Sequence, residues 1–367
     1  MNDKQMNTSL AKEMLMHTAG RFDLDSPAAE IKPYGSGHIN ETFLVTTRNN
    51  TRYILQKISP LLTDDAEGLM KNIRAITDYL RARISDPRGV MPLIPSKDGR
   101  SFIPEASGNW RMYGFIENSV CLLPPQDDVI FYKSALAFGR FVDMLSGFPA
   151  DSLLETLPDF HNTPVRFEQL HRAIRADAAG RKASVTREID FLLEREDEAG
   201  RLQRMRDSGE LPVRVTHNDT KLDNILFDRD TMEPLCVIDL DTVMPGLVLY
   251  DFGDSIRSGA TTAAEDERDL DKVSLDMRRY QLYQEGFAKA CKNLTPLENE
   301  LLPAGAWTIT AEQAARFLAD YLNGDPYYHT AYPEHNLVRC RTQIKLVSEM
   351  ERLLLRKDKA FYGHPSY

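Results

Sequence analysis

The most informative stretch of the chain is residues 213–257, which read VRVTHNDTKLDNILFDRDTMEPLCVIDLDTVMPGLVLYDFGDSIR. Two short apolar runs, at residues 213–215 and 235–238, each lead into a polar loop that contains acidic residues. Such runs are typical of buried strands, and carboxylates at strand ends commonly line a cleft in which functional groups lie. The stretch therefore predicts a small β-rich island that carries a polar site.

Within this island, the sequence His-Asn-Asp at residues 217–219 ends in Asp219, and Asn224 follows five residues later. This is the H-x-D-x-x-x-x-N spacing of a kinase catalytic loop. In phosphoryl transfer the aspartate orients the attacking hydroxyl group and accepts its proton, while the asparagine reaches a Mg²⁺ ion on the phosphates. Lys221 would place a positive charge near the transferred phosphoryl group. Asp239, which ends the second apolar run, is the expected carboxylate ligand of Mg²⁺.

The triplet at residues 251–253 reads Asp-Phe-Gly, which binds Mg²⁺ in protein kinases. Here Asp251 follows a glycine-containing turn and precedes a predicted helix, so we interpret it as a helix N-cap or a brace for the catalytic loop. Asp239 directly follows a buried strand and is the better metal ligand. Each of these residues alone could be a turn or cap residue, but their order behind apolar strands favours a phosphotransfer site.

The strings HNDTKLDNILFD (residues 217–228) and VIDLDTVMPGLVLYDFGDSIR (residues 237–257) resemble the catalytic core of the aminoglycoside phosphotransferase and choline kinase superfamily. Strings similar to the N-acetylhexosamine 1-kinases of that superfamily include YGSGHINETFLVTT (34–47), RYILQKI (52–58), RFLADYL (316–322) and YPEHNLVRCRTQIKLV (332–347). The similarity runs from about Ile31 to about Met350. It implies an α+β, two-lobed, protein-kinase-like fold, with a small β-rich N-terminal lobe and a larger, mainly helical C-terminal lobe.

The resemblance further implies an enzyme that phosphorylates the 1-hydroxyl group of N-acetylglucosamine or N-acetylgalactosamine with ATP and Mg²⁺. Asp219 would be the catalytic base, Asn224 and Asp239 would bind Mg²⁺, and Asp241 would assist at the metal. The positions implied to bind the nucleotide are Gly35, Gly37, Gln56, Glu117 and Lys221. The positions implied to contact the sugar are His38, Arg316 and Tyr327.

The third predicted strand carries Gln56 and Lys57 where protein kinases have the lysine that binds phosphate. Adjacent strand residues point to opposite faces of a sheet, so only one of the two can face the nucleotide. Register with the V-A-I-K pattern favours Gln56, and the nucleotide would then be held without the usual lysine–glutamate pair. Glu67, on the next predicted helix, is a weak candidate for the glutamate of such a pair.

Periodicity along the chain predicts a small α+β lobe followed by a mainly helical one. In the first lobe, strands are predicted at residues 31–34, 42–47, 52–58, 101–104 and 110–116, with a hairpin turn at 48–51 and a helix at 63–84. In the second, helices are predicted at residues 127–147, 164–180, 185–209, 266–291, 310–323 and 336–358. We place the boundary after residue 117, which gives an N-terminal lobe of residues 1–117 and a C-terminal lobe of residues 118–367.

Composition excludes several classes of partner. The 367 residues include 45 Lys or Arg and 55 Asp or Glu, for a net charge of −10, which argues against a nucleic-acid or polybasic membrane binder. No apolar stretch is long enough to cross a bilayer, and the first twenty residues lack the apolar core of a secretory signal.

The four cysteines form no C-x-x-C pair and fit reduced thiols. We therefore expect a cytoplasmic enzyme that binds ATP and a small sugar.

Two alternatives remain open. In the first, the same fold phosphorylates another small acceptor, such as an aminoglycoside, choline, homoserine or another sugar. Cationic acceptors need an acidic pocket, whereas a region led by Arg316 and His38 suits a neutral polyol better. In the second, the chain is a non-catalytic kinase-like module. Gln56 at the phosphate-lysine position favours that reading, and Asp219 with its expected metal-binding partners opposes it. The sequence does not predict the oligomeric state.

Overall fold

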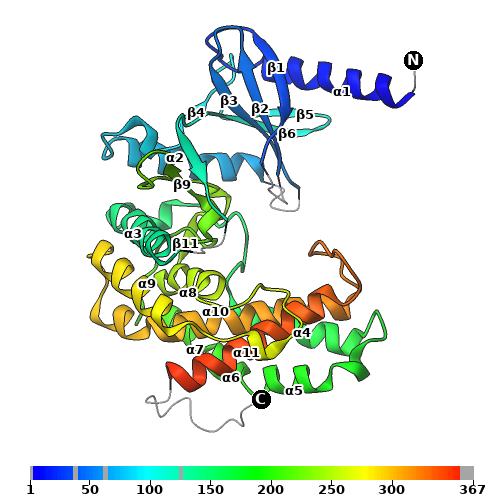
Figure 1. Ribbon diagram of the computed structural model, residues 1–367, viewed down its shortest axis with the longest axis vertical. Coiled ribbons are helices and arrows are strands. Elements are labelled where there is room, and N and C mark those ends of the chain that lie inside the picture. The colour runs from blue at the N-terminus through cyan, green and yellow to red at the C-terminus, as the bar shows by residue number, and fades with distance from the viewer. Residues whose placement is uncertain (1–2, 36–39, 61–64, 124–126, 356–367) are drawn as a thin grey trace.

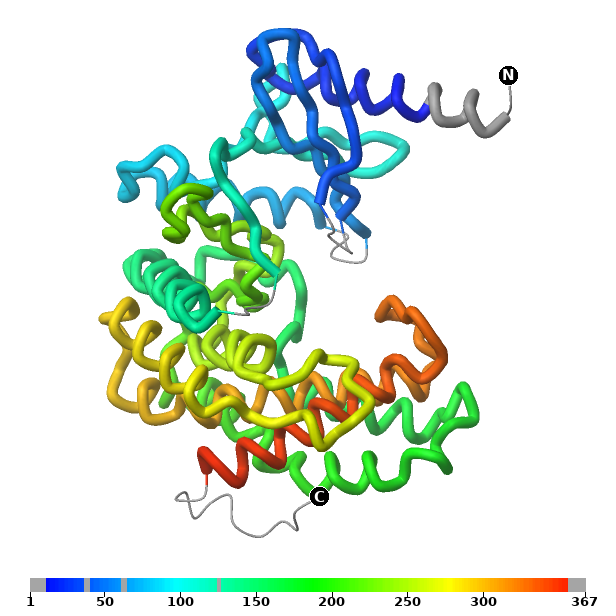
Figure 2. Tube along the Cα trace, viewed as in Figure 1, coloured from blue at the N-terminus to red at the C-terminus, as the bar shows by residue number. Residues whose placement is uncertain are grey.

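The computed structural model describes residues 3–35, 40–60, 65–123 and 127–355, with the side chains of the first helix described from residue 11 onward. Figure 1 shows two lobes stacked along the long axis, an upper one built around a sheet and a lower one built of helices. The upper lobe comes from the first third of the chain, and the rest of the chain forms the lower lobe, as the colour gradient in Figure 2 makes clear. This confirms the α+β, two-lobed fold that the sequence predicts.

The upper lobe contains an antiparallel sheet in the order β1-β2-β3-β6-β4, with β5 also paired to β6. Its strands are β1 (Ala28–Pro33), β2 (Glu41–Thr47), β3 (Arg52–Ile58), β4 (Leu93–Ile94), β5 (Ile103–Glu105) and β6 (Gly108–Gly114). The predicted hairpin turn joins β2 to β3, and Asn50 has a φ of 62°, the left-handed conformation that asparagine tolerates. Helix α1 (Asp3–Ala19), which the sequence did not predict, projects from the edge of the sheet (Figure 1).

Helix α2 (Ala66–Arg81) connects the two lobes through its apolar face. Asp65 caps it by accepting a hydrogen bond from the backbone N–H of Gly68 at 2.8 Å. Leu69, Ile73 and Ile76 are buried at its inner face, in a cluster that also holds residues of the lower lobe, such as Leu240. Because this cluster draws on both lobes, the burial that stabilises α2 also fixes the back of the interlobe junction.

The lower lobe packs its helices around one large apolar cluster. The helices are α3 (Asp128–Met144), α4 (Thr163–Ala176), α5 (Thr186–Leu193), α6 (Glu196–Ala199), α7 (Arg201–Asp207), α8 (Val248–Gly259), α9 (Met277–Ala290), α10 (Pro296–Leu322) and α11 (His335–Leu353). The predicted β-rich island supplies β8 (Arg214–Thr216), β9 (Ile225–Asp228), β10 (Pro234–Val237) and β11 (Met244–Gly246). β7 (Ser119–Cys121), β9 and β10 form one small sheet, and β8 pairs with β11.

Three helix predictions differ from the structure. The segment predicted as one helix at residues 185–209 is divided into α5, α6 and α7, and Arg195, between the first two, is buried and pairs with Glu351. The helix predicted from residue 266 begins only at Met277, where Asp276 caps the first turn. The helix predicted at 310–323 is the second half of α10, which starts at a capping box made by Thr295 and Glu298.

Two further expectations can be compared with the structure. No helix in the described part of the chain is both long and apolar enough to span a membrane. All four cysteines are free thiols, with Cys121 exposed and the other three buried.

Candidate active site

The catalytic loop begins where β8 ends and is held by a carboxylate from α8. Asp251 accepts hydrogen bonds from the backbone N–H groups of His217, at 2.8 Å, and Asn218, at 2.7 Å. Asp251 lies inside the first turn of α8 rather than at its N-cap, so the brace is the correct one of the two sequence interpretations. Burial raises the pKa of this carboxyl to about 6.

His217 ties the catalytic loop to the segment that leads to Asp239. Its Nε2 atom lies 2.9 Å from the carbonyl oxygen of Ile238, and its Nδ1 atom accepts from the backbone N–H of Asp219 at 3.3 Å. The ring packs edge-on against Phe138. Both ring nitrogens of His217 are therefore used within the protein. His217 therefore fixes the spacing between Asp219 and Asp239 without facing the cleft itself.

Asp219, the predicted base, is held between two of the other predicted site residues. Its Oδ1 atom lies 2.7 Å from Nζ of Lys221, and its Oδ2 atom accepts from Nδ2 of Asn224 at 3.0 Å. Burial alone would raise the pKa of Asp219, but the positive charge and hydrogen bond of Lys221 outweigh it and hold this pKa below its usual range. The carboxylate is thus ionised near neutral pH and available as a proton acceptor.

The two predicted metal carboxylates differ sharply in their surroundings. Asp239 has a φ of 60° and no hydrogen-bond partner among the described residues, and its side chain is open to the cleft. The surrounding protein and the charges of Asp241 and Asp219 raise the pKa of Asp239 above its usual range. Asp241 is buried, and both of its oxygens accept hydrogen bonds from Arg111, while Oδ2 also accepts from Asn40 at 2.7 Å. Only Asp239 is therefore available to a cation.

The residues present fit a magnesium ion held jointly with phosphates. In the described part of the chain, no three His, Cys, Asp or Glu side chains gather into a metal cluster. Mg²⁺ in kinase-type sites needs only one or two protein oxygens and takes the rest from phosphate and water. The unpaired carboxylate of Asp239 and the amide oxygen of Asn224, whose nitrogen is used by Asp219, supply oxygens of that kind.

On the sheet side of the cleft, Gln56 and Lys57 point to opposite faces. Gln56 donates to Thr42 at 3.1 Å and accepts from Nε of Arg111 at 3.0 Å, on the face that looks toward Asp241. Lys57 pairs instead with Glu41 at 3.1 Å on the other face. This is the orientation that register with the V-A-I-K pattern predicts.

Two of the other predicted nucleotide positions, Gly35 and Glu117, lie in separate segments of the upper lobe. Glu117 lies between β6 and β7 and pairs with Arg52. Gly35 has a φ of 78° with open space where a Cβ would lie. Gly37 and His38 lie outside the described residues. Glu67 pairs with Lys71 on the exposed side of α2, so it is not the glutamate of a buried pair.

Arg316 and Tyr327 come together in the lower lobe beside Tyr328. The Arg316 guanidinium lies 5.8 Å from the ring centre of Tyr328, and the Tyr327 and Tyr328 rings meet edge to face with centres 4.8 Å apart. Arg316 donates to Gln313 at 3.2 Å and has no carboxylate within ion-pair distance among the described residues. The other N–H donors of this half-buried guanidinium have no hydrogen-bond partner among the described residues.

A hydrogen-bonded chain that the sequence did not predict runs from the catalytic loop to Glu312, near this group. His161 lies 3.0 Å from the carbonyl oxygen of Asn218 through Nε2 and 2.9 Å from Glu312 through Nδ1. Glu312 is one helical turn from Arg316 on α10, and its second oxygen accepts from Thr163 at 2.7 Å. His161, Arg111 and Asn40 carry no local motif, and each meets its partner from a distant part of the chain, so no sequence signal marks them.

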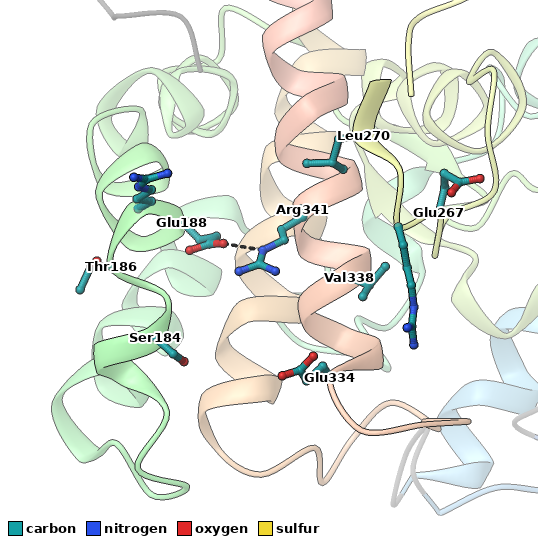
Figure 3. A pocket seen from close by; sticks show the side chains of 10 residues that line it. Ser184, Thr186, Glu188, Glu267, Leu270, Glu334, Val338 and Arg341 are labelled. Atoms are coloured by element: carbon teal, nitrogen blue, oxygen red, sulfur yellow. Dashed lines mark hydrogen bonds and ion pairs between the residues drawn. The ribbon is translucent and has the colours of Figure 1, made fainter. Parts of the chain in front are cut away.

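A cavity of about 120 Å³ lies beside the catalytic loop, and its lining includes Lys221, Asp223 and Ser255. Two other cavities lie farther from the catalytic loop. One, of about 600 Å³, opens between α5, α11 and the segment at residues 267–270. Figure 3 shows Glu188 and Arg341 facing one another across it, joined by an ion pair of 2.6 Å. The cavity is lined by both arginine and glutamate side chains, so its electrostatic potential does not favour a ligand of either charge. An apolar cavity of about 200 Å³ lies between α2, α3 and β10.

Comparison with known proteins places this geometry among phosphotransferases. A family model described as "Phosphotransferase enzyme family" matches residues 30–283, more than half of the chain. Among solved structures, a microcompartment-associated aminopropanol kinase is similar over 95% of this chain and 98% of its own, at 17% identity and a TM-score of 0.60.

Two further structures show the same fold. A spectinomycin phosphotransferase, solved with ADP and spectinomycin, is similar over 93% of this chain and 97% of its own, at 11% identity and a TM-score of 0.60. A choline kinase from Streptococcus pneumoniae is similar over 94% and 99%, at 11% identity and a TM-score of 0.54. At these identities the likeness concerns the fold, and the acceptor has to be inferred from the site itself.

Proposed function

The chain belongs to the phosphotransferase enzyme family, and from that premise we propose that it transfers the γ-phosphoryl group of ATP to the 1-hydroxyl group of an N-acetylhexosamine. N-acetylglucosamine and N-acetylgalactosamine are the two acceptors in question. The observation that carries the acceptor side is the guanidinium of Arg316, which lies beside Tyr328 and one helical turn from Glu312 on α10. Glu312 contacts His161, and His161 contacts the catalytic loop. The sequence similarity to N-acetylhexosamine 1-kinases along most of the chain supports the same substrate.

ATP would lie in the cleft between the sheet and the catalytic loop, with Gly35, Gly37, Gln56 and Glu117 along its upper side. Asn224 and Asp239 would hold Mg²⁺, which neutralises charge on the transferred phosphoryl group when bound. Asp241 is engaged by Arg111, so we assign it a supporting role at the metal rather than direct coordination.

Asp219 would orient the sugar hydroxyl group and accept its proton as the oxygen attacks phosphorus. Its depressed pKa keeps it ionised, and Asn224 fixes its orientation through Oδ2. Lys221 lies 2.7 Å from Oδ1 and brings positive charge to the same place. In this scheme most of the rate enhancement comes from positioning and charge stabilisation.

The charges on the acceptor side favour a neutral acceptor over a cationic one. Both oxygens of Glu312 are used by His161 and Thr163, so this carboxylate is not free to bind an ammonium group. Arg316 would repel such a group, whereas its N–H donors match the oxygens of a sugar or an acetamido carbonyl. His38 and Tyr327 would complete the sugar contacts.

The direct test is ATP consumption with Mg²⁺ over a panel of acceptors: N-acetylglucosamine, N-acetylgalactosamine, glucose, galactose, choline, homoserine and kanamycin. Phosphorus NMR of the product locates the new phosphate. We expect turnover with the N-acetylhexosamines and an anomeric 1-phosphate. Turnover with choline or kanamycin alone would contradict the acceptor assignment, and ATP binding with no turnover on any acceptor would favour a non-catalytic module.

A matched pair of variants tests the role of Arg316. R316M should raise KM for the sugar about 10-fold or more and leave KM for ATP unchanged, because hydrogen bonds to charged groups contribute about 1.5–3 kcal/mol. R187M removes an exposed arginine of α5 and serves as the control. Equal KM values for the sugar in R316M and R187M would remove Arg316 from the acceptor site.

A further inference from the structure

Arg111, on the central strand β6, is a fully buried cation in the middle of the interlobe junction. Its residue is 1% exposed, and it is among the largest side chains that are completely enclosed. Taking a guanidinium out of water is costly unless its donors are satisfied. Its partners therefore show what the fold gains from placing a charge there.

These partners come from both lobes. Thr42, Gln56 and Arg111 are cross-strand neighbours on β2, β3 and β6, and hydrogen bonds run along this row from Arg111 to Gln56 to Thr42. At the other end, two guanidinium nitrogens of Arg111 donate to the two oxygens of Asp241, which follows Asp239 by two residues. Arg111 thus connects the sheet directly to the loop that carries the metal carboxylate.

Asn40, which directly precedes β2, makes the same connection from a second place on the sheet. Its Nδ2 atom donates to Asp241 at 2.7 Å, and its Oδ1 atom accepts from the backbone N–H of Ser59, just after β3, at 3.0 Å. Asp241 thus receives donors from two sites of the sheet, separated by 71 residues of sequence. Because these hydrogen bonds hold the carboxylate of Asp241 in one orientation, they also restrict the backbone of residues 239–241 relative to the sheet.

We propose that Arg111 is a positioning residue for the metal and nucleotide, acting through Asp241. We call the group formed by Arg111, Gln56, Asn40 and Asp241 the interlobe clamp. In place of the lysine–glutamate pair of protein kinases, the interlobe clamp sets the position of Asp239 relative to the sheet. Asp241 acts as the partner of Arg111 rather than as a metal ligand. This proposal rests on the proposed ATP and Mg²⁺ site and adds to it the group that aligns the two halves.

The proposal differs from a purely structural role in what it predicts for metal binding. A buried ion pair that only holds the fold together would, when weakened, lower stability and leave the metal affinity of the folded protein unchanged. If the interlobe clamp sets the position of Asp239, weakening it must lower metal affinity even in the folded protein. Arg195, equally buried and paired with Glu351 through two nitrogens, provides a matched control far from the cleft.

The test measures binding of Mn²⁺ to the full-length protein with a non-hydrolysable ATP analogue, by the loss of the free Mn²⁺ EPR signal, without any acceptor. R111K and D241N should each lower the affinity for Mn²⁺ about 10-fold or more. The double variant R111K/D241N should bind Mn²⁺ as well as the single variant with the lower affinity. R195K should lower Tm without changing Mn²⁺ affinity. Multiplicative effects in the double variant would show that Asp241 reaches the metal independently and would overturn the proposal.

A second variant keeps the test decisive if R111K does not fold. Replacing both members of a buried pair by apolar residues of similar volume is often neutral for stability, so R111M/D241L should fold. It should show the same loss of Mn²⁺ affinity, and affinity within twofold of the wild type would overturn the clamp. If the wild type itself binds no Mn²⁺ with the nucleotide, the proposed nucleotide site fails, and the clamp fails with it.

Discussion

At the scale of single residues, four aspartates around the cleft have the same side chain and four different surroundings. Asp219 is paired with Lys221 and Asn224, and Asp251 accepts two backbone N–H groups. Asp241 is enclosed by donors from the sheet, whereas Asp239 has no hydrogen-bond partner among the residues that the structure describes. The partners, and not the residue type, underlie the different roles that we propose for these four aspartates.

The assignment of Asp219 as base predicts the behaviour of D219N. The amide cannot accept the proton of the acceptor, so kcat should fall about 10²–10⁴-fold, while ATP binding and Tm stay close to those of the wild type. Calorimetric titration with ATP and a thermal melt accompany the kinetic measurement. D223N, which neutralises an exposed carboxylate of the same loop, is the control. Wild-type turnover in D219N would remove Asp219 from the base role.

Local motifs predicted one part of this site and not the other. Asp219 and Asn224 belong to a loop with fixed spacing, and Asp239 follows an apolar strand, so short-range signals mark all three. Arg111 and His161 each meet their partners across more than fifty residues, and strand register or helix packing brings them into place. Nothing in the sequence around them differs from an ordinary strand arginine or loop histidine.

At the scale of elements, the site depends on how closely α8 approaches α10. These helices pack extensively, and α8 carries Asp251 and Asp254, which hold the backbone of the catalytic loop at residues 217, 218 and 220. A Cβ on Gly253 would lie 2.5 Å from the carbonyl oxygen of Gly305 on the facing helix. The two glycines therefore permit a backbone approach that no larger residue allows.

This close approach predicts that G253A destabilises the protein. The atoms that the new methyl group would meet belong to the backbone of α10, which cannot yield without moving a helix, so we expect a loss of about 1–3 kcal/mol. G20A is the control, because a Cβ on Gly20 would lie 3.4 Å from its nearest neighbours, an ordinary contact. Urea unfolding of both variants gives the comparison. Equal stability of G253A and wild type would show that the helices can separate at little cost.

Helix boundaries show where local patterns were insufficient. The apolar spacing located most helices, but Arg195 interrupts a predicted helix because it pairs with Glu351 on α11, a contact that no local pattern contains. At the start of α10, by contrast, the sequence does contain a local signal. Thr295, Pro296 and Glu298 form a standard helix start, so its first half was readable from the sequence but was not predicted.

At the scale of the whole molecule, the two lobes are joined at several separate places. The Arg111–Asp241 pair of the interlobe clamp is buried at the junction of the lobes, the apolar cluster around α2 draws on both lobes, and Arg88 bridges to Asp228 at 2.7 Å. We propose the lobe boundary at residues 117–118, because β6 ends at Gly114 and β7 already pairs with β9 of the lower lobe. The two-lobed architecture follows from the order of strands and helices, whereas these contacts depend on distant residues.

The Arg88–Asp228 bridge gives a pH test of how the lobes are held. The hydrogen bond from Arg88, helped by the backbone N–H groups of Thr231 and Asp230, lowers the pKa of Asp228 to about 2. The ordinary value in an unfolded chain is about 3.9. A carboxyl whose pKa is lower in the folded state stabilises that state above the unfolded pKa, and this stabilisation disappears as pH falls through the folded pKa.

R88Q should therefore melt below the wild type at pH 7 and pH 5, and the difference in Tm should shrink as pH falls from about 4 toward 2, where Asp228 becomes protonated in both proteins. Thermal melts at pH 7, 5, 4 and 3 measure this difference. R187Q, which removes an exposed arginine without a recorded ion pair in the described part of the chain, should show no such dependence. A difference between R88Q and wild type that stays constant over the series would mean that Arg88 joins the lobes by packing, and that the charge of Asp228 plays no part.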